Sequence, residues 1–187
     1  METNNNQQIQ TMETAYKLFK KSIQNYNNTN AHSWLNQHGF KALAIDALFI
    51  SHRVHHGEPI EVKQALESVG IIKVIGNKGH QVFGAKNIAF PLRNETDHVV
   101  NFCSVNIKNN QTTYLNREGV YPHYPSLETT KLFIAKNIIE AATILQSKLL
   151  KEGQSVLALY EGRLLIQHEE AIKKLKQLKE VVFIQKK

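Results

Sequence analysis

Residues 131–184 read KLFIAKNIIEAATILQSKLLKEGQSVLALYEGRLLIQHEEAIKKLKQLKEVVFI and have the most regular pattern of apolar residues in the chain. Three short apolar runs in it alternate with two longer segments that have helical periodicity. The expected strands are residues 132–135, 155–159 and 181–184, and the expected helices are residues 138–150 and 167–178. Because a helix between two strands returns the chain to the same end of a sheet, the pattern predicts a parallel α/β unit.

The sequence between Gly70 and this α/β unit has a different spacing of apolar residues. After Gly70, short apolar runs are separated by turn residues, which is typical of an antiparallel sheet. The expected strands are residues 71–75, 81–83, 87–92 and 99–107. Pro91 is expected at a strand edge or a bulge, because proline has no backbone N–H to donate. Residues 108–125 contain two prolines and three tyrosines and are expected to form a loop.

The first 70 residues are expected to be helical. Residues 1 to about 14 are rich in Asn, Gln and Thr and are predicted to be a mobile tail, followed by a short amphipathic helix over residues 12–26. Further helices are expected after Asn30 and from Pro59 onward. The predicted fold class is α+β: N-terminal helices and a small antiparallel sheet, followed by a partial α/β unit. The expected divisions are residues 1–30, a flexible tail and helix, then 31–127 and 128–187.

Composition favours a folded chain with a polyanionic partner. The 187 residues include 23 Lys and Arg against 16 Asp and Glu, a formal net charge of +7, and most of the surplus follows residue 130. Lys173, Lys174, Lys176 and Lys179 are expected on the outer face of the last helix. Without an apolar run of about 18 residues or a signal peptide, we expect a cytoplasmic protein without membrane contact.

Histidines and the single cysteine are the first candidates for chemistry. His52, His55 and His56 form a cluster, but a zinc site needs further ligands, so surface or packing histidines are favoured. Cys103 lies inside an expected strand and is interpreted as a small buried hydrophobic residue. No local motif by itself indicates an enzyme.

Tyrosines in the expected loop are more informative. Tyr114, Tyr121 and Tyr124 lie near Arg117 and His123. Such a set can stack on bases and attract phosphates, as in proteins that bind single-stranded nucleic acid. The alternative is that the tyrosines and prolines hold a connecting loop against the sheet. The sequence leaves both interpretations open.

Five segments in a fixed order carry a resemblance to a known family. They are NIAFPLRNETDHVVNF (87–102), TYLNREGVYPHYP (113–125), KLFIAKNIIEAATILQ (131–146), SVLALYEGRL (155–164) and HEEAIKKLKQLKEVVFI (168–184). In this order they resemble bacterial DnaG-type primases, particularly the Toprim-containing primase-like proteins of mobile elements. The resemblance covers about residues 31–184, and it implies that the α/β unit is Toprim-like.

The resemblance also implies a metal site whose residues this sequence does not repeat. In the family, a glutamate after the first Toprim strand and a later Asp-x-Asp hold divalent ions for phosphoryl transfer. Lys136 stands where the glutamate is expected, and Gln185 to Lys187 follow the last strand. Three further positions, Asn87, Val105 and Thr113, stand where the family has basic residues. We therefore expect no catalytic residue, no metal ligand and no cofactor.

The preferred hypothesis is a primase-like nucleic-acid-binding or accessory protein of bacterial or mobile-element DNA replication, inactive on its own. Its expected partner is single-stranded DNA or RNA. The residues predicted to bind it are Lys86, Arg93, Tyr114, Arg117, Tyr121, Tyr124 and Lys136. One alternative is an active primase subunit completed by a partner chain. Another is a protein-interaction module, in which a partner or a second copy covers an open sheet edge.

Overall fold

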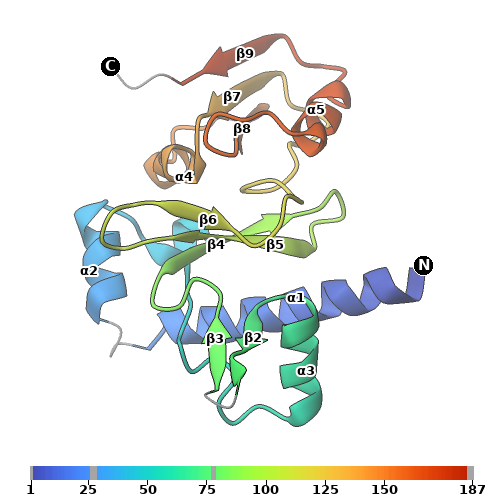
Figure 1. Cartoon of the computed structure of the whole chain (residues 1–187). Helices are drawn as coiled ribbons and strands as arrows, with labels where there is room; N and C mark the ends of the chain where they lie inside the picture. Colours follow the sequence, from blue (N-terminus) through green and yellow to red (C-terminus); the bar gives the residue numbers. More distant parts are fainter. Residues whose placement is uncertain (1, 26–28, 77–78, 185–187) are drawn as a thin grey trace.

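The computed structural model describes residues 2–25, 29–76 and 79–184, and it has an antiparallel part followed by a parallel part (Figure 1). This confirms the predicted α+β fold class. The helices are α1 (Glu2–Ile23), α2 (Thr29–Gln37), the 3-10 helix η1 (Ala42–Ile45), α3 (Ile60–Ser68), α4 (Ile138–Ser147) and α5 (Ile166–Lys173). The strands are β1 (Leu48–Phe49), β2 (Ile72–Val74), β3 (His80–Val82), β4 (Ile88–Arg93), β5 (Val99–Val105), β6 (Thr112–Tyr114), β7 (Lys131–Ala135), β8 (Gln154–Ala158) and β9 (Glu180–Phe183).

The antiparallel part is a four-stranded sheet with strand order β1-β4-β5-β6, accompanied by the β2-β3 hairpin. Strands β4 and β5 form its centre and are almost completely buried. Pro91 lies in β4 opposite Phe102, next to a register shift between Leu92 and Arg93. On this edge of β4, β1 pairs only with Ile88 and Ala89, and Val120 bridges Arg93, so the edge is unpaired at Pro91 between them. This gap accommodates the proline, as the sequence predicted.

Strand β6 was not predicted, because residues 108–125 were expected to be a loop. In the structure, Tyr114 pairs with Cys103, Thr113 with Ser104 and Thr112 with Val105. The strand is only three residues long and turn residues surround it, so its apolar alternation is too short to be recognised. As the last strand of the sheet, β6 faces the parallel part of the chain (Figure 1).

Helix α1 corrects the expectation of a mobile N-terminal tail. It begins at Glu2 and packs against β1, β5 and α3. Met12, Ala15 and Phe19 are buried along one face of the helix. The ring of Phe19 contacts the ring of Phe102 edge-on, with centroids 5.0 Å apart. Residues 5–10 of the helix are mostly exposed, so the tertiary packing acts on the amphipathic stretch from Thr11 onward, and the polar residues before it continue the same helix.

The parallel part is a three-stranded sheet with strand order β8-β7-β9. Asn137 caps α4, because its side chain accepts a hydrogen bond of 3.0 Å from the Glu140 N–H. Both helices end earlier than predicted: Lys148 adopts a left-handed conformation after α4, and turns follow Lys173. The prediction that Lys173, Lys174, Lys176 and Lys179 lie on the outer face of one helix is therefore wrong, because only Lys173 lies within α5.

A continuous core joins the two parts. Tyr121, which follows the 115–119 loop, forms an isolated bridge with Ala158 at the end of β8. Its side chain is only 1% exposed, and its hydroxyl donates a 2.7 Å hydrogen bond to the Ile45 carbonyl. Phe90 packs edge-on against the same ring at 5.4 Å. The expectation that Tyr121 stacks on nucleic acid is corrected, since its ring has no accessible face.

None of the helices in the described part of the chain is long and apolar enough to cross a membrane.

Replacing Phe19 with alanine tests whether α1 belongs to the fold. Because the ring is fully buried, we expect the change to lower the free energy of unfolding by about 3–5 kcal/mol. The exposed neighbour Lys17 provides the matched control, and Lys17→Ala should change stability by less than about 0.5 kcal/mol. Urea denaturation followed by circular dichroism measures both variants. Equal, small effects would show that α1 is not docked.

Candidate nucleic-acid interface

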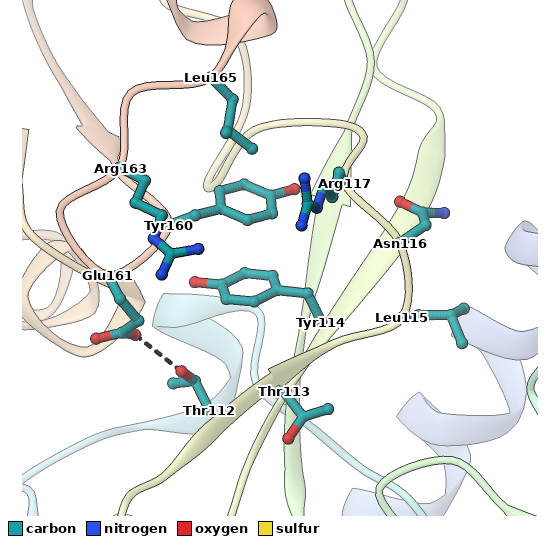
Figure 2. A pocket seen from close by; sticks show the side chains of 10 residues that line it. All are labelled: Thr112, Thr113, Tyr114, Leu115, Asn116, Arg117, Tyr160, Glu161, Arg163 and Leu165. Carbon is teal, nitrogen blue, oxygen red and sulfur yellow. Dashed lines mark hydrogen bonds between the residues drawn. The ribbon is translucent and has the colours of Figure 1, made fainter.

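A groove of about 600 Å³ lies between β6 with its following loop and the turn after β8 (Figure 2). We call it the tyrosine groove. Its lining residues are Thr112, Thr113, Tyr114, Leu115, Asn116, Arg117, Tyr160, Glu161, Arg163 and Leu165. Its volume is within the range of about 300–1,000 Å³ that is usual for small-ligand sites.

Two stacked tyrosines form the centre of the groove. The rings of Tyr114 and Tyr160 are 4.0 Å apart and nearly parallel, at 16°, and they come from the two different parts of the fold. Burial raises the pKa of both hydroxyls well above the ordinary value, so both remain neutral. The Tyr160 hydroxyl donates to the Glu118 carbonyl at 2.5 Å. Tyr160 is only 6% exposed and Tyr114 is half-buried, so the exposed part of Tyr114 is the apolar surface that the pair offers inside a polar rim.

Arginines stand on either side of this pair. Arg117 and Arg163 are exposed, and Figure 2 shows their guanidinium groups next to the tyrosine rings. Within residues 2–25, 29–76 and 79–184, neither arginine has an ion-pair partner. The nearby carboxylate of Glu161 accepts a 2.9 Å hydrogen bond from the Thr112 hydroxyl. Two unpaired cations beside aromatic rings can bind a phosphate and an adjoining base.

Lys136 lies beside the groove, at the carboxyl end of β7. Its carbonyl accepts a 2.7 Å hydrogen bond from the Gly162 N–H, which ties it to the turn that carries Arg163. Its side chain is exposed. In sheets of this kind, ligands bind outside the carboxyl ends of the strands. Lys136 is therefore placed to extend the positive rim of the groove.

A divalent metal does not fit the residues at this end of the sheet. Lys136 contributes a cation, and the Glu140 carboxylate accepts a hydrogen bond from the Lys136 N–H at 2.9 Å. The Glu161 carboxylate is bound to Thr112. Across the described ranges, no three His, Cys, Asp or Glu side chains are arranged to hold a metal ion.

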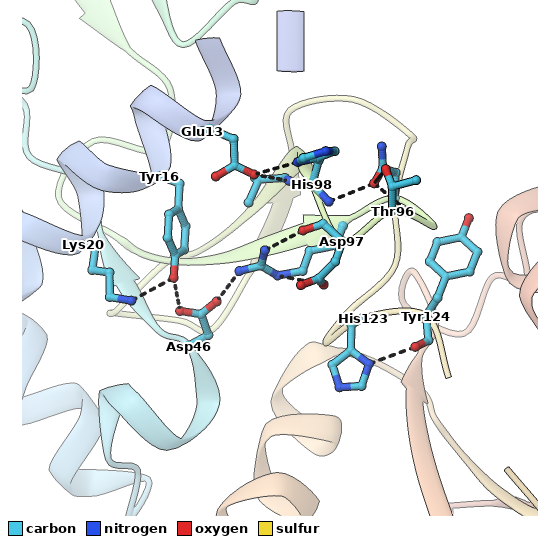
Figure 3. A network of polar contacts seen from close by, with 12 residues as sticks. Glu13, Tyr16, Lys20, Asp46, Thr96, Asp97, His98, His123 and Tyr124 are labelled. Carbon is cyan, nitrogen blue, oxygen red and sulfur yellow. Dashed lines mark hydrogen bonds and ion pairs between the residues drawn. The ribbon is translucent and has the colours of Figure 1, made fainter. Parts of the chain in front are cut away.

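Arg93 belongs to a structural network elsewhere, which corrects its predicted role. Its guanidinium lies 2.9 Å from the Asp46 carboxylate and 5.4 Å from the Tyr16 ring centre. The hydroxyl of Tyr16 donates to Asp46 and accepts from Lys20, as Figure 3 shows. The Arg93 side chain is only 16% exposed. It serves to hold α1 on η1 and β4, and sequence alone could not show this pairing.

Lys86 and Tyr124 also lie apart from the tyrosine groove. Tyr124 lines a separate hollow of about 340 Å³ next to Glu95 and His123. The Lys86 N–H donates to the Ile50 carbonyl at 2.7 Å, and its side chain is exposed. Of the seven residues predicted to bind nucleic acid, only three gather at the groove: Tyr114 and Arg117 line it and Lys136 lies beside it.

The C-terminal lysines divide into paired and unpaired groups. Lys174 pairs with Glu95 of the antiparallel part, and Lys173 pairs with Glu169. Lys176 and Lys179 are exposed and lie in the turns after α5. The predicted lysine face is therefore smaller than the sequence suggested.

Histidines form a packed cluster away from the groove. The His55 ring lies 4.6 Å from that of His56 and 4.7 Å from that of His80, and His80 pairs with Glu67 at 3.2 Å. Burial lowers the pKa of His55, so its neutral form is favoured. His52, also expected to be a surface or packing residue, is exposed.

Cys103 is completely buried, and burial raises the pKa of its thiol.

Tyr160, Glu161 and Arg163 were not predicted from the sequence as site residues. They form a tight turn in which Glu161 and Gly162 both have positive φ angles, 52° and 80°. Their position immediately after an expected parallel strand was the available signal, because ligand-binding residues gather there. Their proximity to Tyr114 depends on the packing of two distant segments, which no local pattern reveals.

The whole chain has the fold of bacterial DnaG primase catalytic cores. It is similar to a DnaG primase catalytic domain bound to single-stranded DNA, with a TM-score of 0.77 and 14% identity, covering 98% of this chain and 62% of that one. The zinc-binding and RNA polymerase domains of Aquifex aeolicus primase give a TM-score of 0.76 at 10% identity, covering 96% of this chain and 48% of that one. A DNA primase domain from Pseudomonas aeruginosa gives a TM-score of 0.75 at 12% identity, covering 94% of this chain and 60% of that one. The chain thus spans about half to three-fifths of these structures.

No family model and no curated protein matches the sequence.

His168 provides a test of the region behind the groove. It is fully buried, packs edge-on against Tyr160, and its Nδ1 accepts a 2.9 Å hydrogen bond from the Leu165 N–H. Burial lowers its pKa below the ordinary value of 6.5, so the unfolded chain binds a proton more readily. The resulting stability is complete above pH 6.5 and is lost as the pH falls through the lower pKa of the folded state.

We therefore expect urea denaturation midpoints to fall between pH 7.5 and 5.5, and to fall less in His168→Gln. Glutamine keeps an acceptor for the Leu165 N–H but does not titrate. The exposed His123 supplies the control, because His123→Gln replaces an imidazole that lies outside the buried region behind the groove. An unchanged dependence in His168→Gln would contradict this role of His168.

Proposed function

We propose that this chain binds single-stranded nucleic acid in the tyrosine groove. The observation that carries the proposal is the stacked pair Tyr114 and Tyr160 beside two unpaired arginines, Arg117 and Arg163. The exposed part of Tyr114 can stack on any base while Tyr160 supports its ring from behind, and the arginines can bind the phosphates that join the bases. The net charge of +7 favours the same partner.

The proposed role is that of a primase-like binding or accessory protein in bacterial or mobile-element DNA replication. Two observations support it: the chain shares the fold of primase catalytic cores, and one of those cores is described as bound to single-stranded DNA. At 14% identity the likeness concerns the fold, so the binding role rests on the groove itself.

We propose further that the chain does not synthesise primers by itself. Lys136 stands where the family resemblance places a metal-binding glutamate, and its ammonium group repels divalent ions. The same charge favours a phosphate, which suits binding rather than catalysis. The last three residues, Gln185 to Lys187, lie outside the described residues. If a partner chain supplies acidic ligands, primer synthesis should appear only when both proteins are present.

Salt dependence of binding tests the groove directly. We expect a fluorescein-labelled single-stranded oligonucleotide to bind more weakly as NaCl rises, with or without magnesium. Arg117→Gln and Arg163→Gln should each reduce the slope of log K against log salt by about 0.7, because each removes one phosphate contact. Fluorescence anisotropy at four salt concentrations gives the slopes.

Lys17→Gln removes one positive charge from the exposed face of α1 and serves as the control. It should leave the slope within error of the wild-type value. If all three variants weaken binding alike, the interaction is diffuse attraction to net charge. If the oligonucleotide does not bind even at low salt, the proposed function is wrong.

A second candidate function is a protein-interaction module. Strand β9 is an edge strand, and its Val181 and Phe183 side chains are 42% and 67% exposed. An exposed apolar edge strand tends to pair with another chain. Sedimentation-equilibrium measurements should then show dimers at high concentration, and Val181→Lys should abolish them. A monomer at every concentration would count against pairing with a second copy.

A further inference from the structure

The loop of residues 115–119 carries Arg117 and connects β6 to the bridge at Val120. It has no helix or strand of its own, so its shape depends on contacts with other segments. Packing helps to fix the loop at Gly119, where φ is +74° and an added Cβ would lie 2.8 Å from a Val100 methyl group. Most of the polar contacts come from three buried side chains outside the loop.

Asn101, in β5, makes the largest number of these contacts and is fully buried. Its side-chain amide donates to the carbonyls of Asn116 and Glu118, both at 3.0 Å, on either side of Arg117. Its carbonyl oxygen accepts from the Asn116 N–H at 3.0 Å and from the Phe102 N–H at 2.7 Å. One asparagine therefore holds the loop at both flanks of the arginine.

The parallel part holds the loop from the opposite side. The Tyr160 hydroxyl donates to the Glu118 carbonyl and accepts from the Asn101 amide at 3.1 Å. Gln167, buried at the start of α5, donates to the Arg117 carbonyl at 2.9 Å and to the Gly119 carbonyl at 3.3 Å. The backbone of Arg117 is thus fixed between the two parts of the chain, while its guanidinium remains exposed.

We propose that Asn101 is a positioning residue for Arg117: it fixes the loop so that the guanidinium is held beside the tyrosine pair, where a phosphate can be bound. The inference rests on the proposed function, which it extends from the residues that touch the ligand to a buried one that does not. Tyr160 and Gln167 complete the anchor from the parallel part.

The physical reason is conformational entropy. An arginine on an unanchored loop keeps its charge but must order its backbone when it binds a phosphate, and each residue ordered has an entropic cost. In an anchored loop, the backbone is already ordered when the chain folds, so binding does not carry this entropic cost. Removing the anchor should therefore weaken binding through Arg117 and leave binding through cations on other segments unchanged.

The test is a double-mutant cycle measured by oligonucleotide anisotropy. Asn101→Ser removes the amide, and Arg117→Gln removes the guanidinium. Alone, each should weaken binding by roughly fivefold, equivalent to one lost phosphate contact. Together they should also weaken it by roughly fivefold, because the second change removes a contact already lost. The control cycle combines Asn101→Ser with Lys136→Gln. In it, the fold-changes in affinity of the two single variants should multiply in the double variant.

Gln167→Met covers the case in which Asn101→Ser does not fold. Methionine has a similar volume, keeps the position buried and removes only the hydrogen bonds to the loop. It should show the same coupling to Arg117→Gln, with a circular dichroism spectrum like that of the wild type. The unfolding midpoint should fall, because the loop carbonyls lose a donor, so the coupling is the decisive readout. A role in stability alone would give no coupling.

Multiplicative effects of Gln167→Met and Asn101→Ser with Arg117→Gln would overturn the positioning role. If Arg117→Gln by itself changes neither affinity nor salt slope, Arg117 makes no contact, and the positioning role fails with it. Failure of the proposed function is distinguishable, because in that case the wild-type chain does not bind the oligonucleotide.

Discussion

The docking of Tyr160 against Tyr114 and Asn101 is the contact on which the rest of the site depends. It joins the end of β8 to the antiparallel sheet by one stacked ring and by hydrogen bonds of the Tyr160 hydroxyl with Asn101, Glu118 and Gly119. Buried polar groups are costly unless they are paired, so this arrangement permits essentially one alignment of the two parts. The groove exists because that alignment brings β6 and the turn after β8 together.

Charge pairing decides which cations are available to a ligand. The sequence has a large basic surplus, yet several of its cations are engaged within the fold: Arg93 with Asp46, Lys131 with Glu180, and Lys174 with Glu95. Arg117 and Arg163 are unpaired in the described part of the chain and lie at the groove that Tyr114 and Tyr160 line. Position, rather than net charge, distinguishes them from the other basic residues.

Local patterns predicted the alternation of strands and helices after residue 130 because each element there is long enough to show its period. They did not predict β6, which is three residues long, or the docking of α1, which depends on Phe102 in a distant strand. For the site, composition pointed to Tyr114 and Arg117. It could not separate them from Tyr121, whose burial results from tertiary packing.

Photo-crosslinking tests whether single-stranded nucleic acid contacts the tyrosine groove. A single-stranded oligonucleotide containing bromodeoxyuridine is bound to the chain, irradiated, and the adducts are mapped by mass spectrometry after trypsin digestion. We predict crosslinks in the peptide of residues 109–117, which contains Tyr114. In Arg117→Gln, where trypsin no longer cuts after residue 117, we predict loss of most of these crosslinks from the longer peptide of residues 109–131. Crosslinks confined to the lysine-rich segment after α5, with none in residues 109–117, would contradict it.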